Sequence, residues 1–296
     1  MCLLAARPRP HYVERMTITR SLARIKSLPP PAPGQFGPQH TAIEVITPSE
    51  WEDADPFILL MDDRAHGRLN AGPHPHAGFE TVSFLVDGAI PSENSGGEHL
   101  TPGDVEWTTT GSGIVHGPDK PIDGRFRMLQ LWLTLPKADR WTEPDHQLVR
   151  RDDAPARQDD GAEVRLYSGA SGPLRSTTRN RVPVTLVDIR LAPGASITQV
   201  LPASHNGFLY PLEGVVTVGP DALAVQQVGW LDRPATASGE TELVIGNHGS
   251  EPARVLLYAG ERQNTPIAWY GPFIGDTRQD IVRSIERYKS GTFVRV

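Results

Sequence analysis

The segment HPHAGFE, residues 74–80, carries the clearest chemical signal in the sequence. Two histidines separated by one residue on an extended segment point to the same face, as two ligands of one metal ion must. Imidazole nitrogen suits iron, copper, nickel and zinc, so the pair His74 and His76 indicates a transition-metal site without selecting the metal. In isolation, such a pair would fit a solvated turn equally well.

A third ligand is expected from His116, the last residue of the segment GSGIVH. The segment follows a turn at residues 101–104 and a predicted strand at 105–108, and a spacing of about forty residues corresponds to one or two β-hairpins. A lone histidine here would more often be structural, so the prediction depends on the glycine-rich turn. Ordinary surface roles are expected for the remaining histidines, which are His11, His40, His66, His99, His146, His205 and His248. Of these, His66 and His99 could approach the mouth of a pocket.

Glu80 is the candidate fourth ligand and the candidate catalytic residue. It lies four residues beyond His76, where a carboxylate could complete the ligand set or orient a histidine. The alternative is a polar residue on a half-buried strand. Glu106 is expected to face outward from its strand, and Asp62-Asp63 are expected to cap the end of a strand.

The elements that must position these residues read as short strands. Segments rich in β-branched and aromatic residues alternate with Gly- and Pro-containing turns, as in sandwiches and barrels. These segments are 43–46, 57–61, 81–86, 128–135, 184–191, 208–212, 215–218, 243–245 and 253–258. Near the end, Thr277 and Asp280 resemble a capping box, and a helix is predicted from there until Gly291. The fold class is therefore all-β, with one short C-terminal helix.

The chain of 296 residues is long enough for two domains. Residues 1–40, which include a proline run at 29–33, are predicted to form a partly disordered N-terminal arm. A charged stretch at 150–161 favours a boundary, with a first domain at 41–150 that holds the metal site and a second at 151–296 that includes the helix. The similar turns LVDG at 85–88 and PLEG at 211–214 suggest an internal duplication.

Composition excludes several classes of protein. With 29 Lys and Arg against 35 Asp and Glu, no broad positive field would attract nucleic acid or an anionic membrane. The single Cys2 excludes an internal disulfide and catalysis by a cysteine pair. No apolar stretch reaches the roughly 20 residues that span a bilayer. We expect a cytoplasmic monomer.

Taken together, these residues resemble the pirin family, a branch of the cupins, from about residue 16 to the C-terminal helix. The resemblance rests on an ordered series of motifs, not on one of them. The series is DPF at 55–57 with MDD at 61–63, HPHAGFETV at 74–82, PGDVEW at 102–107, GSGIVH at 111–116, PG at 193–194, VGPD at 218–221, AGE at 259–261 and YGPF at 270–273.

The resemblance implies two stacked cupin barrels of jelly-roll type, with an iron site in the first. It implies that His74, His76 and His116 are ligands, together with a glutamate two residues after the third histidine. Pro118 stands at that position and offers no side-chain ligand, so Glu80, Asp119 or water is expected to replace it. We expect Fe(2+) as the cofactor, with other divalent transition metals as alternatives. When the two halves are matched by their turns, Val200, Pro202 and Asn206 occupy the candidate ligand positions in the second half. These residues do not form a metal site, so the second barrel is expected to bind no metal.

Three functions remain open. The resemblance implies a metal-dependent dioxygenase acting on a flavonol such as quercetin, which makes a small aromatic substrate the expected partner and Glu80 the expected base. The alternative is a non-catalytic, iron-dependent regulator that binds a protein partner, a role that suits the missing glutamate. A metal-free binding protein or scaffold is the third reading.

Overall fold

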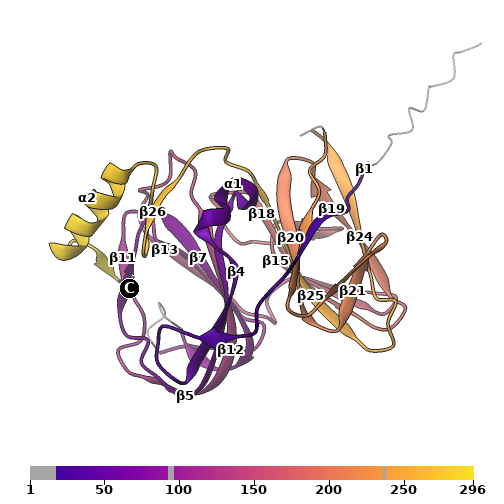
Figure 1. Cartoon of the computed structure of the whole chain (residues 1–296), viewed down its shortest axis with the longest axis horizontal. Coiled ribbons are helices and arrows are strands. Elements are labelled where there is room, and N and C mark those ends of the chain that lie inside the picture. The colour runs from indigo at the N-terminus through magenta and orange to yellow at the C-terminus, as the bar shows by residue number, and fades with distance from the viewer. Residues whose placement is uncertain (1–17, 93–96, 236–237) are drawn as a thin grey trace, which may run out of the picture.

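The computed structural model describes residues 18–92, 97–235 and 238–296. They form two β-barrels side by side, and the helix α2 (Arg278–Lys289) lies at the outer end of the first barrel (Figure 1). The predicted all-β fold with two barrels and a C-terminal helix is confirmed. Part of the predicted disorder falls on residues 1–17, outside the described residues. Within the described part of the arm, short strands form at β1 (Ile18–Thr19), β2 (Leu22–Ser27) and β3 (Ala32–Pro33).

The first barrel has one large and one small sheet. The large sheet contains, in spatial order, β13 (Asp145–Val149), β10 (Val105–Thr109), β7 (Phe79–Gly88), β12 (Ile122–Thr134), β5 (Phe57–Leu69), β4 (His40–Ile46) and β3. The small sheet contains β28 (Val294–Arg295), β11 (Ile114–His116) and β6 (His74–His76). Around these lie the short pair β8 (Ile90–Pro91) and β9 (His99–Leu100), the 3-10 helix η1 (Pro48–Glu50) and the helix α1 (Trp51–Ala54).

The second barrel repeats this plan. Its large sheet contains, in spatial order, β14 (Ala156–Asp159), β15 (Ala162–Ser168), β18 (Val184–Leu191), β25 (Ala253–Glu261), β20 (His205–Glu213), β23 (Gln227–Leu231) and β2. The opposing sheet contains β1, β24 (Glu240–Gly246), β21 (Val215–Val218) and β22 (Asp221–Ala224), with β19 (Ser196–Pro202) also paired to β24. Two short hairpins complete the structure, β16 (Ala170–Ser171) with β17 (Leu174–Arg175) and β26 (Ala268–Tyr270) with β27 (Phe273–Gly275).

The strand orders support the internal duplication. When one large sheet is read in reverse, β7, β12 and β5 of the first barrel correspond to β20, β25 and β18 of the second. Gly88 is the last residue of β7 and has φ 84°, and Gly214 directly follows β20 and has φ 65°. A Cβ at Gly88 would lie 2.0 Å from the Arg125 carbonyl oxygen, and one at Gly214 would lie 2.5 Å from the Pro252 carbonyl oxygen. Only glycine fits at either turn.

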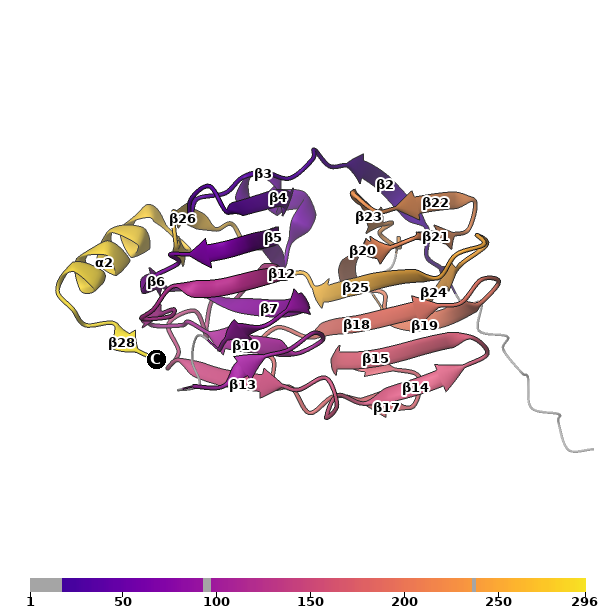
Figure 2. The ribbon, with the colours of Figure 1, turned by 90° about the horizontal axis from the view of Figure 1, so that it is seen from below.

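Both ends of the described chain cross to the opposite barrel, which corrects the predicted domain limits. The strands β1 and β2 pair with β24 and β23 of the second barrel, although they belong to the predicted arm. In the other direction, β28 pairs with β11, and α2 packs beside the first barrel (Figure 2). Because the ends cross, the boundary near residue 150 separates only the central parts of the two barrels. Long-range strand pairing of this kind leaves no local signal in the sequence.

The two barrels differ in what fills them. One face of each large sheet contributes to a shared core, in which Phe57 and Trp107 of the first barrel join Phe208 and Tyr258 of the second. The interior of the second barrel is filled by a separate aliphatic core that includes Val187, Leu209 and Leu257. The interior of the first barrel is hollow near β6. Within the described ranges, no helix has the length and apolar character needed to cross a membrane.

Candidate metal centre

The structure brings the three predicted histidines together. His74 and His76 lie on β6, and His116 lies on the antiparallel neighbour β11, directly opposite His74. Each residue offers one ring nitrogen, and these three nitrogens lie within 4.8 Å of one another. The ring centroids are 4.7–4.9 Å apart. This is a set of imidazoles that could hold one metal ion.

Burial prepares the three histidines to act as ligands. It lowers the pKa of His116 to about 3 and that of His76 well below the ordinary value, and the neighbouring imidazoles act in the same direction. Burial also lowers the pKa of His74. The three rings are therefore neutral near pH 7, and a neutral ring keeps the nitrogen lone pair that a metal requires.

Hydrogen bonding leaves suitable nitrogens for a metal. The Nδ1 of His74 lies 3.0 Å from the carbonyl oxygen of Gly72, which can only accept, so Nδ1 carries the hydrogen and Nε2 keeps the lone pair. Within the described part of the chain, neither ring nitrogen of His76 makes a hydrogen bond of normal geometry. The donor set therefore fits a transition-metal ion.

Glu80 does not join this set, which corrects its predicted role. Its two carboxylate oxygens accept hydrogen bonds from Trp107 Nε1 at 3.1 Å and from Thr109 Oγ1 at 2.7 Å. The preceding residue, Phe79, packs against His76 with ring centroids 5.2 Å apart. Because successive residues of a strand face opposite sides, Glu80 points toward the shared core and away from the histidines.

Asp119, the other predicted replacement, lies on the surface. Its side chain is 83% exposed and forms an ion pair with Arg295. Arg295 also donates to the Gly117 carbonyl oxygen at 3.4 Å, so the turn after His116 is attached to the C-terminal strand. Among the described residues, the cluster that could hold a metal contains no carboxylate.

The C-terminal segment covers the loop that leads to His116. The strand β28 runs parallel to β11. Phe293, just before it, fills the space beside Gly113, where an added Cβ would lie 2.4 Å from the ring. The guanidinium group of Arg287, on α2, donates to the Ser112 carbonyl oxygen. Sequence reasoning missed this contribution, because nothing local links residues 287–295 to residues 112–117.

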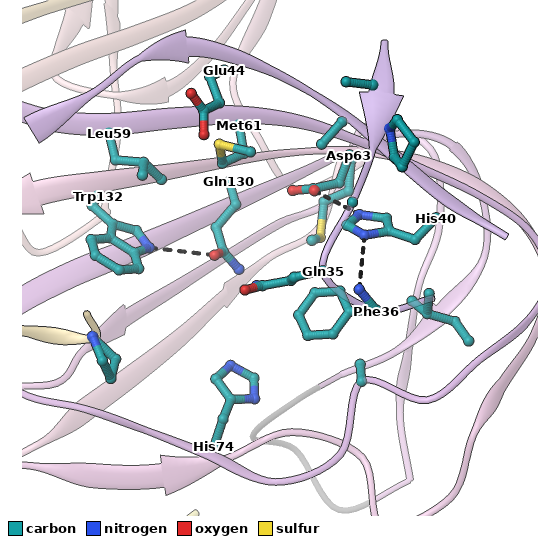
Figure 3. Close-up of a pocket in the computed structure, with 18 of the residues that line it drawn as sticks. Gln35, Phe36, His40, Glu44, Leu59, Met61, Asp63, His74, Gln130 and Trp132 are labelled. Carbon is teal, nitrogen blue, oxygen red and sulfur yellow. Dashed lines mark hydrogen bonds and ion pairs between the residues drawn. The ribbon is translucent and has the colours of Figure 1, made fainter. Parts of the chain in front are cut away.

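A cavity of about 800 Å³ lies inside the first barrel, and His74 (Figure 3) and His76 border it. Its apolar wall includes Leu59, Met61, Met128, Trp132 and Phe36. Its polar groups come from the loop before β4 and from the inward faces of β4, β5 and β12; they are Gln35, His40, Glu44, Asp63 and Gln130. The chain thus places an aromatic-lined chamber directly beside the candidate ligands.

Three hydrogen bonds organise the polar groups of the cavity. The indole Nε1 of Trp132 donates to Gln130 Oε1 at 3.3 Å, which leaves the Gln130 amide group as a donor. His40 Nδ1 accepts from the backbone N–H of Phe36 at 3.4 Å, so His40 Nε2 donates to Asp63 Oδ1 at 2.8 Å (Figure 3). His40 therefore connects the loop before β4 to the barrel wall.

Several expectations from the sequence are wrong. His40 is buried and lines the cavity, although a surface role was expected, whereas His66 and His99 are not on the wall that the structure describes. Asp63 lies within β5 instead of capping it. Glu106 is buried and does not face solvent. Strand alternation could have found the inward residues, because 59, 61 and 63 share one face of β5, but it does not show which face encloses a cavity.

Comparison with known proteins agrees with this fold. The family model "Pirin" matches residues 40–133, and the model "Pirin C-terminal cupin domain" matches residues 186–294. A pirin-like protein of Solanum lycopersicum is 33% identical over 82% of this chain and 83% of its own. Pirin of Homo sapiens is 32% identical over 81% of this chain and 83% of its own.

A solved structure extends the likeness to nearly the full length. Quercetin 2,3-dioxygenase from Acinetobacter baumannii superposes with a TM-score of 0.80 at 25% identity, over 93% of this chain and 98% of that one. Fold and site together define a protein of two cupin barrels with a three-histidine site in the first. Within that class, the sequence relatives show that the chain belongs to the pirin family.

Proposed function

We propose that the protein is an iron-dependent dioxygenase that acts on a flavonol such as quercetin. The observation that carries this proposal is the cavity of about 800 Å³ that borders His74 and His76. A flavonol is flat and largely apolar, with hydroxyl groups at its edge, and such ligands favour apolar pockets with a few polar groups. The activity of the similar protein from Acinetobacter baumannii supports the same reaction class.

The residues of the cavity suit the tasks of this reaction. When bound by the three histidines, Fe(2+) supplies a site for a deprotonated substrate oxygen and activates the substrate toward dioxygen. Trp132 and Phe36 offer aromatic surfaces against which the substrate rings can pack. The amide N–H of Gln130 can donate to a substrate oxygen, and the apolar part of the wall would reduce contact of the substrate with water.

In this proposal Glu44, and not Glu80, is the catalytic base that accepts the proton of the substrate. The Glu80 carboxylate is fully buried and faces away from the cavity. Glu44 instead is an exposed residue of β4 that borders the cavity, beside Met61 in the adjacent strand (Figure 3). A carboxylate within reach of the substrate hydroxyl group can accept its proton.

Oxygen uptake tests the proposal. The protein is loaded anaerobically with Fe(2+), its metal content is measured by elemental mass spectrometry, and oxygen consumption is followed after quercetin is added. We expect about one iron per chain and quercetin-dependent uptake, both lost in His116→Ala. The matched control is His66→Ala, which removes an exposed histidine of the same barrel and should change neither.

A second candidate is a non-catalytic, metal-dependent regulator that binds a protein partner. The observation that favours it is the lack of a carboxylate among the described residues of the metal-binding cluster. Bound iron without uptake on any flavonol tested would favour this function over the dioxygenase. Failure to bind metal after reconstitution would contradict both and leave the metal-free binding protein.

A further inference from the structure

The wall of the cavity carries carboxylates that no lysine or arginine of the wall balances. Glu44 on β4 and Asp63 on β5 border the cavity, and none of the described residues that line it is a lysine or an arginine. Its other titratable groups are His40 and the candidate ligands His74 and His76. The proposed reaction needs one carboxylate as a base, but it does not account for a wall without a cationic side chain.

Strand alternation produces this distribution of charge. Met61 and Asp63 on β5 and Gln130 on β12 line the cavity, and the register places Gln130 opposite Met61. The strand β4 contains neither lysine nor arginine. Successive residues of a strand face opposite sides, and the arginines of β5 and β12 stand at the alternate positions. These outward-facing residues are Arg64, Arg68, Arg125 and Arg127.

The outward arginines bind other carboxylates. Arg64 and Arg127 each lie 2.9 Å from the Asp62 carboxylate, on the face of β5 opposite to the cavity. Asp63, by contrast, accepts a hydrogen bond from His40 at 2.8 Å. Among the described residues, no lysine or arginine forms an ion pair with Asp63 or Glu44. The negative charge of the cavity is therefore not neutralised by a strongly basic side chain.

A ligand that carries a negative charge is disfavoured in such a cavity. Moving a sulfate or carboxylate group out of water removes its hydration, and no lysine or arginine on the described wall replaces the lost interactions. The charges of Glu44 and Asp63 also repel it. An uncharged hydroxyl group can instead donate to a carboxylate, and a keto oxygen can accept from the amide group of Gln130.

We propose that the cavity selects uncharged polyphenols and rejects those that carry a sulfate, phosphate or carboxylate group. Glu44 makes the larger contribution to this selection, because it is exposed where it borders the cavity, whereas the Asp63 side chain is 14% exposed and bound to His40. The inference rests on the proposed function, since it specifies which flavonols are substrates. It concerns binding in the cavity and not the reaction with oxygen.

Binding of two flavonols to the metal-free full-length protein tests the inference. Quercetin and quercetin 3′-sulfate share one ring system and differ by an anionic substituent. Their dissociation constants are obtained from quenching of tryptophan fluorescence, because Trp132 and Trp269 line the cavity. The titrations are made at about pH 6, where phenolic hydroxyl groups are uncharged. We expect the sulfate ester to bind about tenfold more weakly or worse.

Salt separates the effect of charge from that of size. Raising the salt concentration from about 0.05 M to about 0.5 M should narrow the difference between the two flavonols, because salt screens charges that are open to solvent. A difference caused by the volume of the sulfate group would not respond to salt. A salt-independent difference would therefore overturn the inference, as would equal affinities of the two flavonols for the wild type. Both results would leave the proposed function standing.

Reversal of the charge at Glu44 identifies the residue responsible. In Glu44→Lys the ratio of the two dissociation constants should fall by about tenfold, because repulsion of the sulfate group is replaced by attraction. The matched control is Glu240→Lys, the same change at an exposed residue of β24 in the second barrel, and it should alter the ratio by less than about twofold. An unchanged ratio in Glu44→Lys would overturn the role of Glu44.

The titrations also separate failure of the inference from failure of the proposed function. If quercetin binds only after zinc(II) is added, the same ratio is measured in that form. A wild-type protein that binds neither flavonol, with or without zinc(II), would contradict the proposed function and this inference together. The comparison of the two flavonols on the wild type needs no variant, so it holds even if Glu44→Lys fails to fold.

Discussion

Glu80 lies one residue from Phe79, yet the two side chains face different parts of the molecule. Phe79 contacts His76, and Glu80 contacts Trp107 in the core shared by the barrels. Burial raises the pKa of Glu80 to about 7, and the hydrogen bonds from Thr109 and Trp107 oppose this only in part. Because Glu80 faces away from the histidines, its protonation should affect the free energy of unfolding more than the binding of a metal.

The raised pKa of Glu80 predicts a pH dependence of stability. Since its folded-state pKa exceeds the ordinary 4.5, its contribution is full below pH 4.5 and is lost as the pH rises through 7. Between pH 5 and pH 8 the loss should be roughly 2–3 kcal/mol in the free energy of unfolding. In Glu80→Gln this part of the pH dependence should disappear, as urea unfolding at the two pH values would show. If wild type and variant lose the same stability, Glu80 does not titrate in this range.

At the scale of elements, the metal site depends on strands that are distant in sequence. The strand β11 is held between β6, which carries two ligands, and β28. Phe293 occupies the space beside Gly113, three residues before His116, and the guanidinium group of Arg287 lies over its ring. The position of His116 therefore depends on packing by the C-terminal segment.

Phe293→Ala should loosen β11 and weaken metal binding. Replacing a buried phenylalanine by alanine typically costs about 3–5 kcal/mol, and part of that loss should appear as a lower melting temperature. We also expect weaker binding of cobalt(II), titrated as a substitute for iron, because His116 becomes less well positioned. The control is Val294→Ala at the adjacent, exposed position, which should leave both quantities nearly unchanged. Equal cobalt affinity in Phe293→Ala and wild type would show that β11 holds its position without this contact.

Local patterns predicted some elements well and others not at all. The capping box at Thr277 predicted the start of α2, and there the Thr277 hydroxyl accepts from the N–H of Asp280. The spacing of His74 and His76 predicted a shared face, and His116 was found from its turn. The inward direction of Glu106, the burial of His40 and the crossing of β2 and β28 depend on strand pairing between distant segments, which composition and spacing do not encode.

At the scale of the whole molecule, the barrels are joined by more than a linker. The hydroxyl group of Tyr210 in the second barrel donates to Asp62 Oδ2 at 2.7 Å, and Arg127 binds both oxygens of the same carboxylate. The Asn206 amide donates to the Asp53 and Asp55 carbonyl oxygens at 2.8 and 3.0 Å. Together with the shared core, these contacts mean that each barrel stabilises the other.

The shared core and the crossed ends predict a single unfolding unit. Scanning calorimetry should show one transition, with a calorimetric enthalpy equal to the van't Hoff enthalpy. Fragments 41–150 and 151–296, produced separately, should fail to fold, because the first lacks β28 and the second lacks β1 and β2. Two resolved transitions, or a fragment that unfolds cooperatively on its own, would contradict this view.

The pairing of β28 with β11 also sets an order of events during protein synthesis. The ribosome makes His74, His76 and His116 within the first half of the chain, but the strand that holds β11 in place is made only when residue 295 is reached. A nascent chain that carries all three histidines would thus still lack the support of the strand that carries His116. Any stable loading of this candidate site with metal would consequently have to follow the synthesis of β28.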